Sequence, residues 1–162
     1  MKVQAQKLTD ILTKLLTANK SLLAVADRKT EVIKENDVSA LNEILKMEQK
    51  HIALINQLEQ QRRAETARLL MSGTGEPALS DVISMVDGKE KEQLKSLQKE
   101  LVTCIQLLKE RNDLNQQLLY QSLQLVNLTL DLIQPTPQSF NYERPEKQMM
   151  GAKTRSVFNS KA

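Results

Sequence analysis

The residues best suited to chemistry are a Glu48-x-x-His51 pair and a single thiol, Cys104. In four-helix bundles, Glu-x-x-His spacing supplies metal ligands when two helices each carry it. This chain has one His, so it cannot carry a second copy, and we interpret the pair as polar residues beside a helical seam. One His and one Cys also give no paired-His zinc motif, no CxxC motif and no expected Cys–His nucleophile. We therefore predict no metal site, no catalytic residue and no cofactor.

Two further patterns could suggest catalysis, and neither supports it. Residues 73–78 (GTGEPA) superficially match a dinucleotide-binding fingerprint, but that fingerprint works only between a strand and a helix, and no strand precedes it. Carboxylates at Glu90, Glu92 and Glu100 alternate with lysines, which is typical of a solvated helix face. We expect that this protein is not an enzyme.

The composition is that of a helical protein. Aromatic residues make up 2% of the chain, Trp is absent, and leucine dominates the apolar residues. Val and Ile never alternate with polar residues over the roughly 4 to 8 positions that a half-buried strand requires. The longest apolar run, Leu22 to Ala26, is five residues, far short of the roughly 20 that span a bilayer. With no secretory signal after Met1 either, we expect a cytoplasmic protein without stable membrane insertion.

The net charge of +3 resides in residues 134–162, which carry five basic and two acidic side chains. The remaining chain has eighteen of each sign, so no basic stripe follows the helices, which argues against nucleic-acid binding. Residues 134–162 also hold three of the four prolines and show no apolar periodicity. We predict a helical domain at 1–133 followed by a flexible basic tail at 134–162.

Heptad spacing of apolar residues predicts two long helices, over about 4–35 and 89–133. In the first, Leu8, Leu15 and Leu22 lie one heptad apart and form a coiled-coil seam. The last helix keeps the same spacing over its whole length.

Another long helix is expected between these two. Asn36 or Asp37 is suited to cap it after a tight antiparallel turn, and it would continue to Met71. Polar residues interrupt its seam, so we predict that its packing loosens toward Arg62 and Arg63.

Two glycines and a proline within residues 72–77 stop that helix, because Gly and Pro both oppose helix propagation. Pro77 is suited to begin a short helix over about 78–86. The fold class predicted is all-α: an elongated antiparallel bundle or coiled coil of three long helices and one short helix, with a disordered C-terminal tail.

The last helix carries the most informative surface. From Leu114 to Leu130 no side chain is charged, yet apolar residues of its C-terminal part spread over roughly 220° of the circumference. A single packing seam requires only about 100°. The surplus must be covered by the chain's own helices, by a second copy in a self-associating scaffold, or by the amphipathic helix of another protein. The candidate binding residues are Leu114, Leu118, Leu119, Leu123, Val126, Leu130 and Ile133.

Two segments resemble the FlgN family of flagellar export chaperones. One is Leu58-Glu-Gln-Gln-Arg62-Arg63 in the second helix, and the other is Arg111-Asn112-x-x-Asn115-x-x-Leu118-Leu119 in the last. A Pro-containing tail with an aromatic residue soon after the final helix also fits. The resemblance covers roughly residues 5 to 142.

This resemblance implies a cytoplasmic chaperone that binds the C-terminal helical regions of the hook–filament junction proteins FlgK and FlgL and prevents their premature association. It also implies that the apolar arc of the last helix is the client surface. Family members tend to carry a tyrosine in a Y-G-x-x-G setting that docks at the export gate protein FlhA. Here Tyr142, with Phe140 nearby, is the candidate, although both glycines of that setting are missing.

Overall fold

The computed structural model describes residues 2–71 and 78–133. These residues form four helices in the order α1, α2, α3 and α4, and no strand occurs in the described ranges. The all-α prediction with three long helices and one short helix is confirmed. The predicted tail lies outside the described residues. The chain divides into two units, Met1–Leu118 and Leu119–Ala162. The helix bounds are α1 Lys2–Glu35, α2 Val38–Leu70, α3 Leu79–Met85 and α4 Gly88–Ile133.

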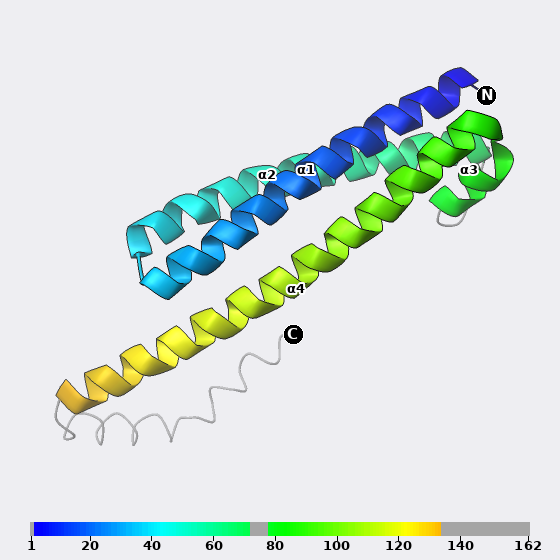
Figure 1. The fold of residues 1–162 in the computed structure, drawn as a ribbon. Helices are drawn as coiled ribbons and strands as arrows, with labels where there is room; N and C mark the ends of the chain where they lie inside the picture. The colour runs from blue at the N-terminus through cyan, green and yellow to red at the C-terminus, as the bar shows by residue number, and fades with distance from the viewer. Residues whose placement is uncertain (1, 72–77, 134–162) are drawn as a thin grey trace, which may run out of the picture. The chain divides into compact units, whose positions relative to one another are not determined.

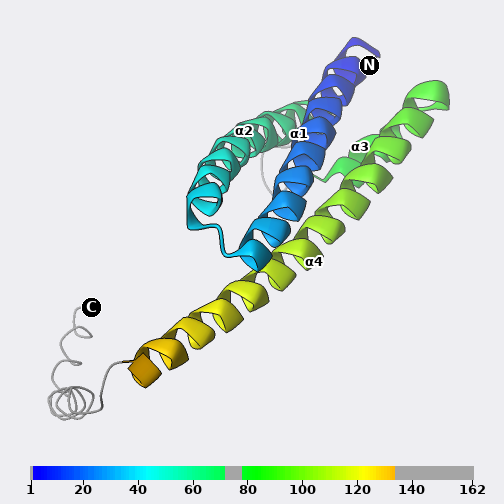
Figure 2. The ribbon, with the colours of Figure 1, turned by 60° about the vertical axis from the view of Figure 1, so that its left-hand side comes forward.

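The turn between α1 and α2 has the expected cap. Asp37 is the N-cap of α2, and its side chain accepts a hydrogen bond from the Ala40 backbone N–H at 3.0 Å. Asn36 before it has φ +56°, in the left-handed region that Asn tolerates better than most residues. Together these two residues reverse the chain within two positions, so α1 and α2 lie antiparallel (Figures 1 and 2).

Within Met1–Leu118, α4 runs in the same direction as α1. Lys20 Nζ lies 3.7 Å from Glu100 Oε2, and Arg111 Nε lies 2.7 Å from Asp27 Oδ1. From the first ion pair to the second, the residue number rises in both helices, from Lys20 to Asp27 in α1 and from Glu100 to Arg111 in α4. The two helices are therefore parallel. Because α2 is antiparallel to α1, the long helices run up, down and up.

The core of this unit gathers near the start of α1, the end of α2, α3 and the first turns of α4 (Figure 1). Leu8, Leu12, Val82 and Leu94 are fully inaccessible to solvent. The short helix α3 therefore contributes core side chains instead of merely linking α2 to α4. A smaller cluster, made of Val25, Val32 and Ile44, lies where α1 and α2 approach their turn.

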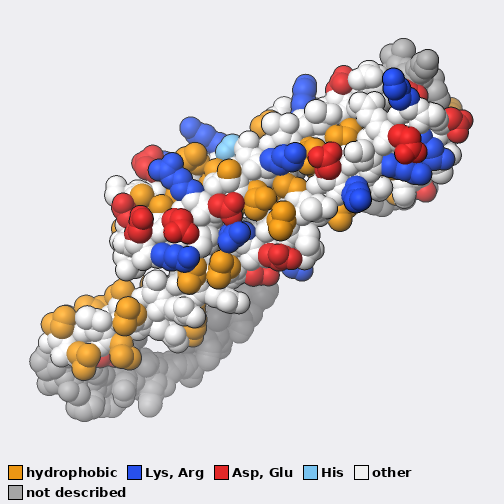
Figure 3. Space-filling model, viewed as in Figure 1, with side chains coloured by type: hydrophobic (Ala, Val, Ile, Leu, Met, Phe, Trp, Pro, Cys, Tyr) orange, Lys and Arg blue, Asp and Glu red, His pale blue; other side chains and the backbone are white. Residues whose placement is uncertain are grey.

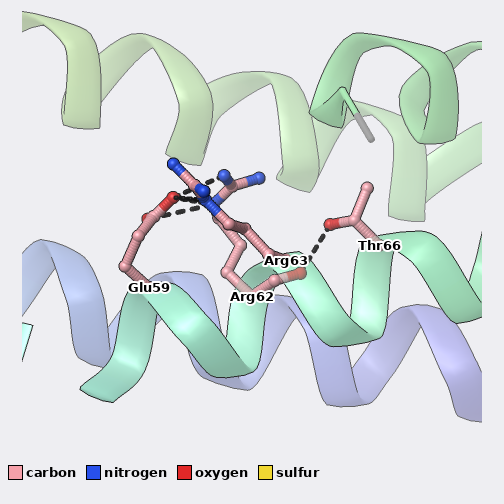
Figure 4. A network of polar contacts seen from close by, with 4 residues as sticks. All are labelled: Glu59, Arg62, Arg63 and Thr66. Atoms are coloured by element: carbon pink, nitrogen blue, oxygen red, sulfur yellow. Dashed lines mark hydrogen bonds and ion pairs between the residues drawn. The ribbon is translucent and has the colours of Figure 1, made fainter. Parts of the chain in front are cut away.

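The expectation that α2 loosens toward Arg62 and Arg63 is wrong. Beyond these arginines Thr66 and Leu69 are buried, whereas Val38 at the start of α2 is 69% exposed. The polar residues are accommodated by pairing with one another. Glu59 accepts two hydrogen bonds of 3.0 Å from Arg62 Nε and a longer one from Arg63, and the Thr66 hydroxyl donates to the Arg62 carbonyl (Figure 4).

Candidate functional site

The buried seam of α4 runs along one face through most of Met1–Leu118. Its buried residues are Leu94, Leu97, Leu101, Cys104, Leu108 and Asn115. These are the predicted heptad positions, and Leu94, Leu97, Leu101 and Cys104 belong to a core cluster that also contains residues of α1, α2 and α3. This helix therefore begins as an ordinary core helix.

The seam ends with a buried polar contact between α1 and α4. Asn115 is 2% exposed; its Oδ1 accepts a hydrogen bond of 2.5 Å from the Thr30 hydroxyl, and its Nδ2 donates to the Ala26 carbonyl at 3.0 Å. Thr30 is likewise buried and lies five residues before the end of α1 at Glu35. Buried polar pairs of this kind fix the register of packed helices, because a shift would leave both groups without partners.

The candidate binding residues that follow lie in two settings. Leu114 and Leu118 belong to the first unit and are half-buried, as is Leu119 at the start of the second. Within the second unit, every residue from Leu123 to Ile133 is exposed. The exposed fractions of the remaining candidates are 62% for Leu123, 51% for Val126, 47% for Leu130 and 70% for Ile133.

Three more leucines share this exposure, although they were not among the candidate binding residues. Leu125, Leu128 and Leu132 are 65%, 60% and 83% exposed. The signal that identifies them is the same uncharged stretch of sequence. Figure 3 shows apolar side chains gathered on the last turns of α4, whereas basic and acidic side chains are scattered over α1 and α2. From Leu119 to Ile133, Asp131 is the one charged residue.

Two carboxylates with a lowered pKa, Glu59 and Glu65, lie in the C-terminal half of α2. The Glu65 side chain is 2% exposed and accepts hydrogen bonds from Arg68 Nε at 2.6 Å and Nη2 at 2.8 Å. These bonds lower the pKa of Glu65 despite the opposing effect of burial, and the charges of Arg68 and Lys7 lower it further. The hydrogen bond from Arg62 likewise lowers the pKa of Glu59. These are structural ion pairs between or within helices.

The residues first considered for chemistry are Glu48, His51 and Cys104, and His51 is half-buried. Glu48 pairs with Lys29 across the α1–α2 hairpin at 3.1 Å, and both side chains are 13% exposed. Cys104 is buried in the core, and this burial raises the pKa of its thiol. Within the described ranges no three His, Cys, Asp or Glu side chains are grouped so as to hold a metal ion. The GTGEPA loop and the candidate docking residues Phe140 and Tyr142 lie outside the described residues, apart from Ala78.

No helix within residues 2–71 or 78–133 is both long enough and apolar enough to cross a membrane.

Comparisons with known proteins agree with this picture. The FlgN protein family model matches residues 1–149. A protein of Bacillus subtilis (strain 168), the uncharacterized protein YvyG, is 30% identical over 161 residues, covering 99% of this chain and 100% of the relative. No solved structure matches significantly. A long helical hairpin, a parallel last helix with an apolar end, and a family match over nearly the whole length lead to one conclusion: the chain belongs to the FlgN family of flagellar export chaperones.

Proposed function

We propose that this chaperone binds the C-terminal helical regions of FlgK and FlgL in the cytoplasm. The client surface consists of Leu114, Leu118, Leu119, Leu123, Val126, Leu130 and Ile133 of α4. Covering the client's apolar helices would keep them from associating before export. The chaperone would then deliver its client to the export gate.

The exposure of the last turns of α4 is the observation that supports this proposal. Large apolar side chains are common on protein surfaces as single residues, but contiguous groups of them mark interaction sites. Here Leu123, Val126, Leu130 and Ile133 are all between 47% and 70% exposed and lie within eleven residues of one helix. A partner helix with its own apolar stripe is the natural counterpart of such a surface.

The energy available from this surface is moderate. Burying a whole Leu, Val or Ile side chain contributes about 1.5–3 kcal/mol, so covering these four partly exposed residues supplies on the order of 3–7 kcal/mol. The client's own apolar residues add a comparable amount. Association costs roughly 4–15 kcal/mol in lost freedom, and ordering the client adds to that cost. Because the apolar gain and the association cost are of similar size, we expect a reversible complex, which suits a chaperone that must release its client.

The proposal is tested by titrating purified full-length chaperone with C-terminal fragments of FlgK and FlgL in a calorimeter. We expect saturable binding that Leu119→Asp and Val126→Asp weaken by about tenfold or more, since each places a charge in an apolar interface. Asn127→Asp adds the same charge at an exposed polar position of the same helix and is the matched control. Absence of saturable binding, or equal binding by all three variants, would contradict the proposal.

Self-association is the competing explanation for the same exposed residues. A structural scaffold would bury them against a second copy of α4 and bind no client. Light scattering distinguishes the two, because a tight dimer or tetramer that persists when client fragments are added favours the scaffold. A monomer that forms a defined complex with the fragment supports the chaperone.

Docking at FlhA is proposed for the segment that carries Phe140 and Tyr142. The support is the family resemblance alone, since the two glycines expected around the tyrosine are missing and the segment lies outside the described residues. Tyr142→Ala and Phe140→Ala, alone and together, should weaken binding of the client-loaded chaperone to the cytoplasmic part of FlhA while leaving client affinity unchanged. Unchanged FlhA binding by the double variant would remove both residues from this role.

A further inference from the structure

The last residues of α4, Leu119 to Ile133, carry large apolar side chains over more than half of the helix circumference. At about 100° per residue, these side chains occupy roughly 220°, which we call the apolar arc. Its members are Leu119, Leu123, Leu125, Val126, Leu128, Leu130, Leu132 and Ile133. All but the half-buried Leu119 are between 47% and 83% exposed. Gln124, Asn127 and Asp131 lie on the opposite side, and Asp131 is the one charged residue of this stretch.

Three polar residues fall inside the apolar arc, and each tolerates an apolar environment. Gln121 lies near one edge, from which a long side chain can reach water. Ser122 and Thr129 lie near the middle. The Thr129 hydroxyl donates to the Leu125 carbonyl at 2.9 Å, and a serine can form the same bond to the carbonyl four residues earlier. Hydroxyls satisfied within their own helix leave water without an unpaired donor, so the whole arc can be covered.

A single partner helix covers less than half of the apolar arc. A packed helix contacts an arc of about 100°, and the proposed client residues of this stretch span roughly 80°. Leu125, Leu128 and Leu132 lie outside that span and are 65%, 60% and 83% exposed. Binding of one client helix therefore leaves three large leucines in water.

A second copy of α4 is a poor cover for these three leucines. They belong to a heptad row whose earlier positions are Leu107, Arg111, Leu114, Leu118 and Gln121. Arg111 Nε pairs with Asp27 Oδ1 of α1 at 2.7 Å, and a helix packed along the whole row would take this ion pair out of water at a cost. Beyond Arg111, the row is shorter than the roughly three to four heptads typical of a coiled coil. It therefore offers a second copy only a short seam.

A lipid surface can cover the entire apolar arc at once. Amphipathic helices lie in the membrane interface with their apolar side buried by about 5–10 Å. A helix with its side chains is about 10–12 Å across, so immersion by about 7–8 Å covers roughly 220° of its circumference. Asp131 lies nearly opposite the centre of the arc and would stay in water. The width of the arc and the position of the one charge both suit this arrangement.

The residues that follow α4 favour an anionic surface. Residues 134–162 carry five basic and two acidic side chains, and from residue 147 onward there are four basic side chains and no acidic one. A single apolar element gives only marginal membrane binding, whereas an apolar element joined to basic residues adds attraction to anionic headgroups. The sequence after Ile133 supplies that second attraction.

We propose that the end of α4 lies on an anionic lipid surface when no client covers it, with the basic residues beyond position 146 adding electrostatic attraction. This is reversible adsorption to the interface and involves no stable insertion. It goes beyond the proposed function. The client residues Leu123, Val126 and Leu130 share the arc, so client and lipid exclude one another, and only this competition rests on the proposed function.

Co-flotation with vesicles tests the proposal in the full-length protein. Vesicles of phosphatidylglycerol mixed with phosphatidylcholine should bind about tenfold or more tightly than vesicles of phosphatidylcholine alone, and added salt should weaken that binding. Leu125→Glu, inside the arc, should weaken binding about tenfold or more. Gln124→Glu adds the same charge on the polar side and should change affinity less than about threefold. Circular dichroism of both variants must show the helix content of the parent chain.

Three results would overturn the proposal: no binding to the mixed vesicles, equal affinity for both kinds of vesicle, or equal weakening by Leu125→Glu and Gln124→Glu. A photoreactive amino acid at position 125 should crosslink to lipid, and capture of a second copy in the presence of vesicles would overturn the proposal in favour of self-association.

A FlgK C-terminal fragment tests the competition. A saturating amount should release the chaperone from the mixed vesicles, and a fragment that binds without releasing it would overturn the shared use of the arc. Absence of saturable fragment binding in solution is a different result, which overturns the proposed function and leaves the vesicle binding unaffected.

Discussion

Replacing Thr30 by Val should destabilise the protein more than replacing its partner Asn115. In the described part of the chain, the Thr30 hydroxyl makes the one hydrogen bond to Asn115 Oδ1, at 2.5 Å, and both residues are no more than 3% exposed. Valine has nearly the shape of threonine but no donor. Thr30→Val therefore leaves a buried carbonyl oxygen unsatisfied without opening a cavity.

The opposite change leaves nothing unsatisfied. In Asn115→Leu the branched shape is kept, and the Thr30 hydroxyl still has the Ala26 carbonyl as an acceptor at 3.1 Å. An unsatisfied buried acceptor costs about 1–3 kcal/mol, whereas a near-isosteric swap in a core usually costs less than about 1.5 kcal/mol. In the double variant both polar groups are gone, so we expect it to be more stable than Thr30→Val alone.

Urea unfolding followed by circular dichroism at 222 nm measures these differences. Thr30→Val should lower the free energy of unfolding by about 1–3 kcal/mol, and adding Asn115→Leu should restore at least half of that loss. If Thr30→Val unfolds like the parent chain, or if the double variant loses the sum of both single losses, the buried hydrogen bond is not what stabilises this contact.

Three further substitutions test other features. Glu65→Gln should lower stability by about 1–3 kcal/mol at pH 7. Because the pKa of Glu65 in the folded state lies below 4.5, the carboxylate stabilises the fold above that pH, and this contribution disappears as the pH falls through the folded pKa. The melting temperatures of the parent chain and Glu65→Gln should therefore converge on acidification. A difference that stays constant with pH would contradict this. Asp37→Ala should cost about 0.5–2 kcal/mol by removing the α2 cap, whereas Asp37→Asn should cost much less in the same urea assay. Leu8→Ala, at a fully buried core position, should cost about 2–5 kcal/mol, and a loss below 1 kcal/mol would show that the site collapses around the cavity.

Much of the fold follows from local rules that the sequence displays. The heptads of α1 predicted buried positions such as Leu8 and Leu15, and the Asn36-Asp37 pair predicted the reversal. The burial of Glu65 and Thr66 was not predictable in this way, because polar residues at seam positions normally indicate weak packing. Their polar groups find partners within α2, Arg68 for Glu65 and the Arg62 carbonyl for Thr66, and Lys7 of α1 pairs with Glu65 across the helices. That last contact is tertiary, and helical periodicity does not predict it.

The candidate site was only partly predictable for a similar reason. The uncharged stretch indicates a surplus of apolar area, but apolar residues keep recurring at heptad positions of α4 as far as Leu132, between polar ones such as Asn115 and Ser122. Nothing in that spacing shows where burial ends. The structure shows that Asn115 is the last fully buried residue of α4 and that Leu123 and those after it are exposed.

The burial of Cys104 has a practical consequence for labelling. Thiol-reactive dyes attack the thiolate, and the core environment of Cys104 both hides this sulfur and raises its pKa. A cysteine introduced at an exposed polar position such as Asn127 would react far faster under native conditions. Fluorophores or spin labels can therefore be attached to the end of α4 without removing the native thiol, which leaves the hydrophobic interior unaltered while client docking is followed in real time.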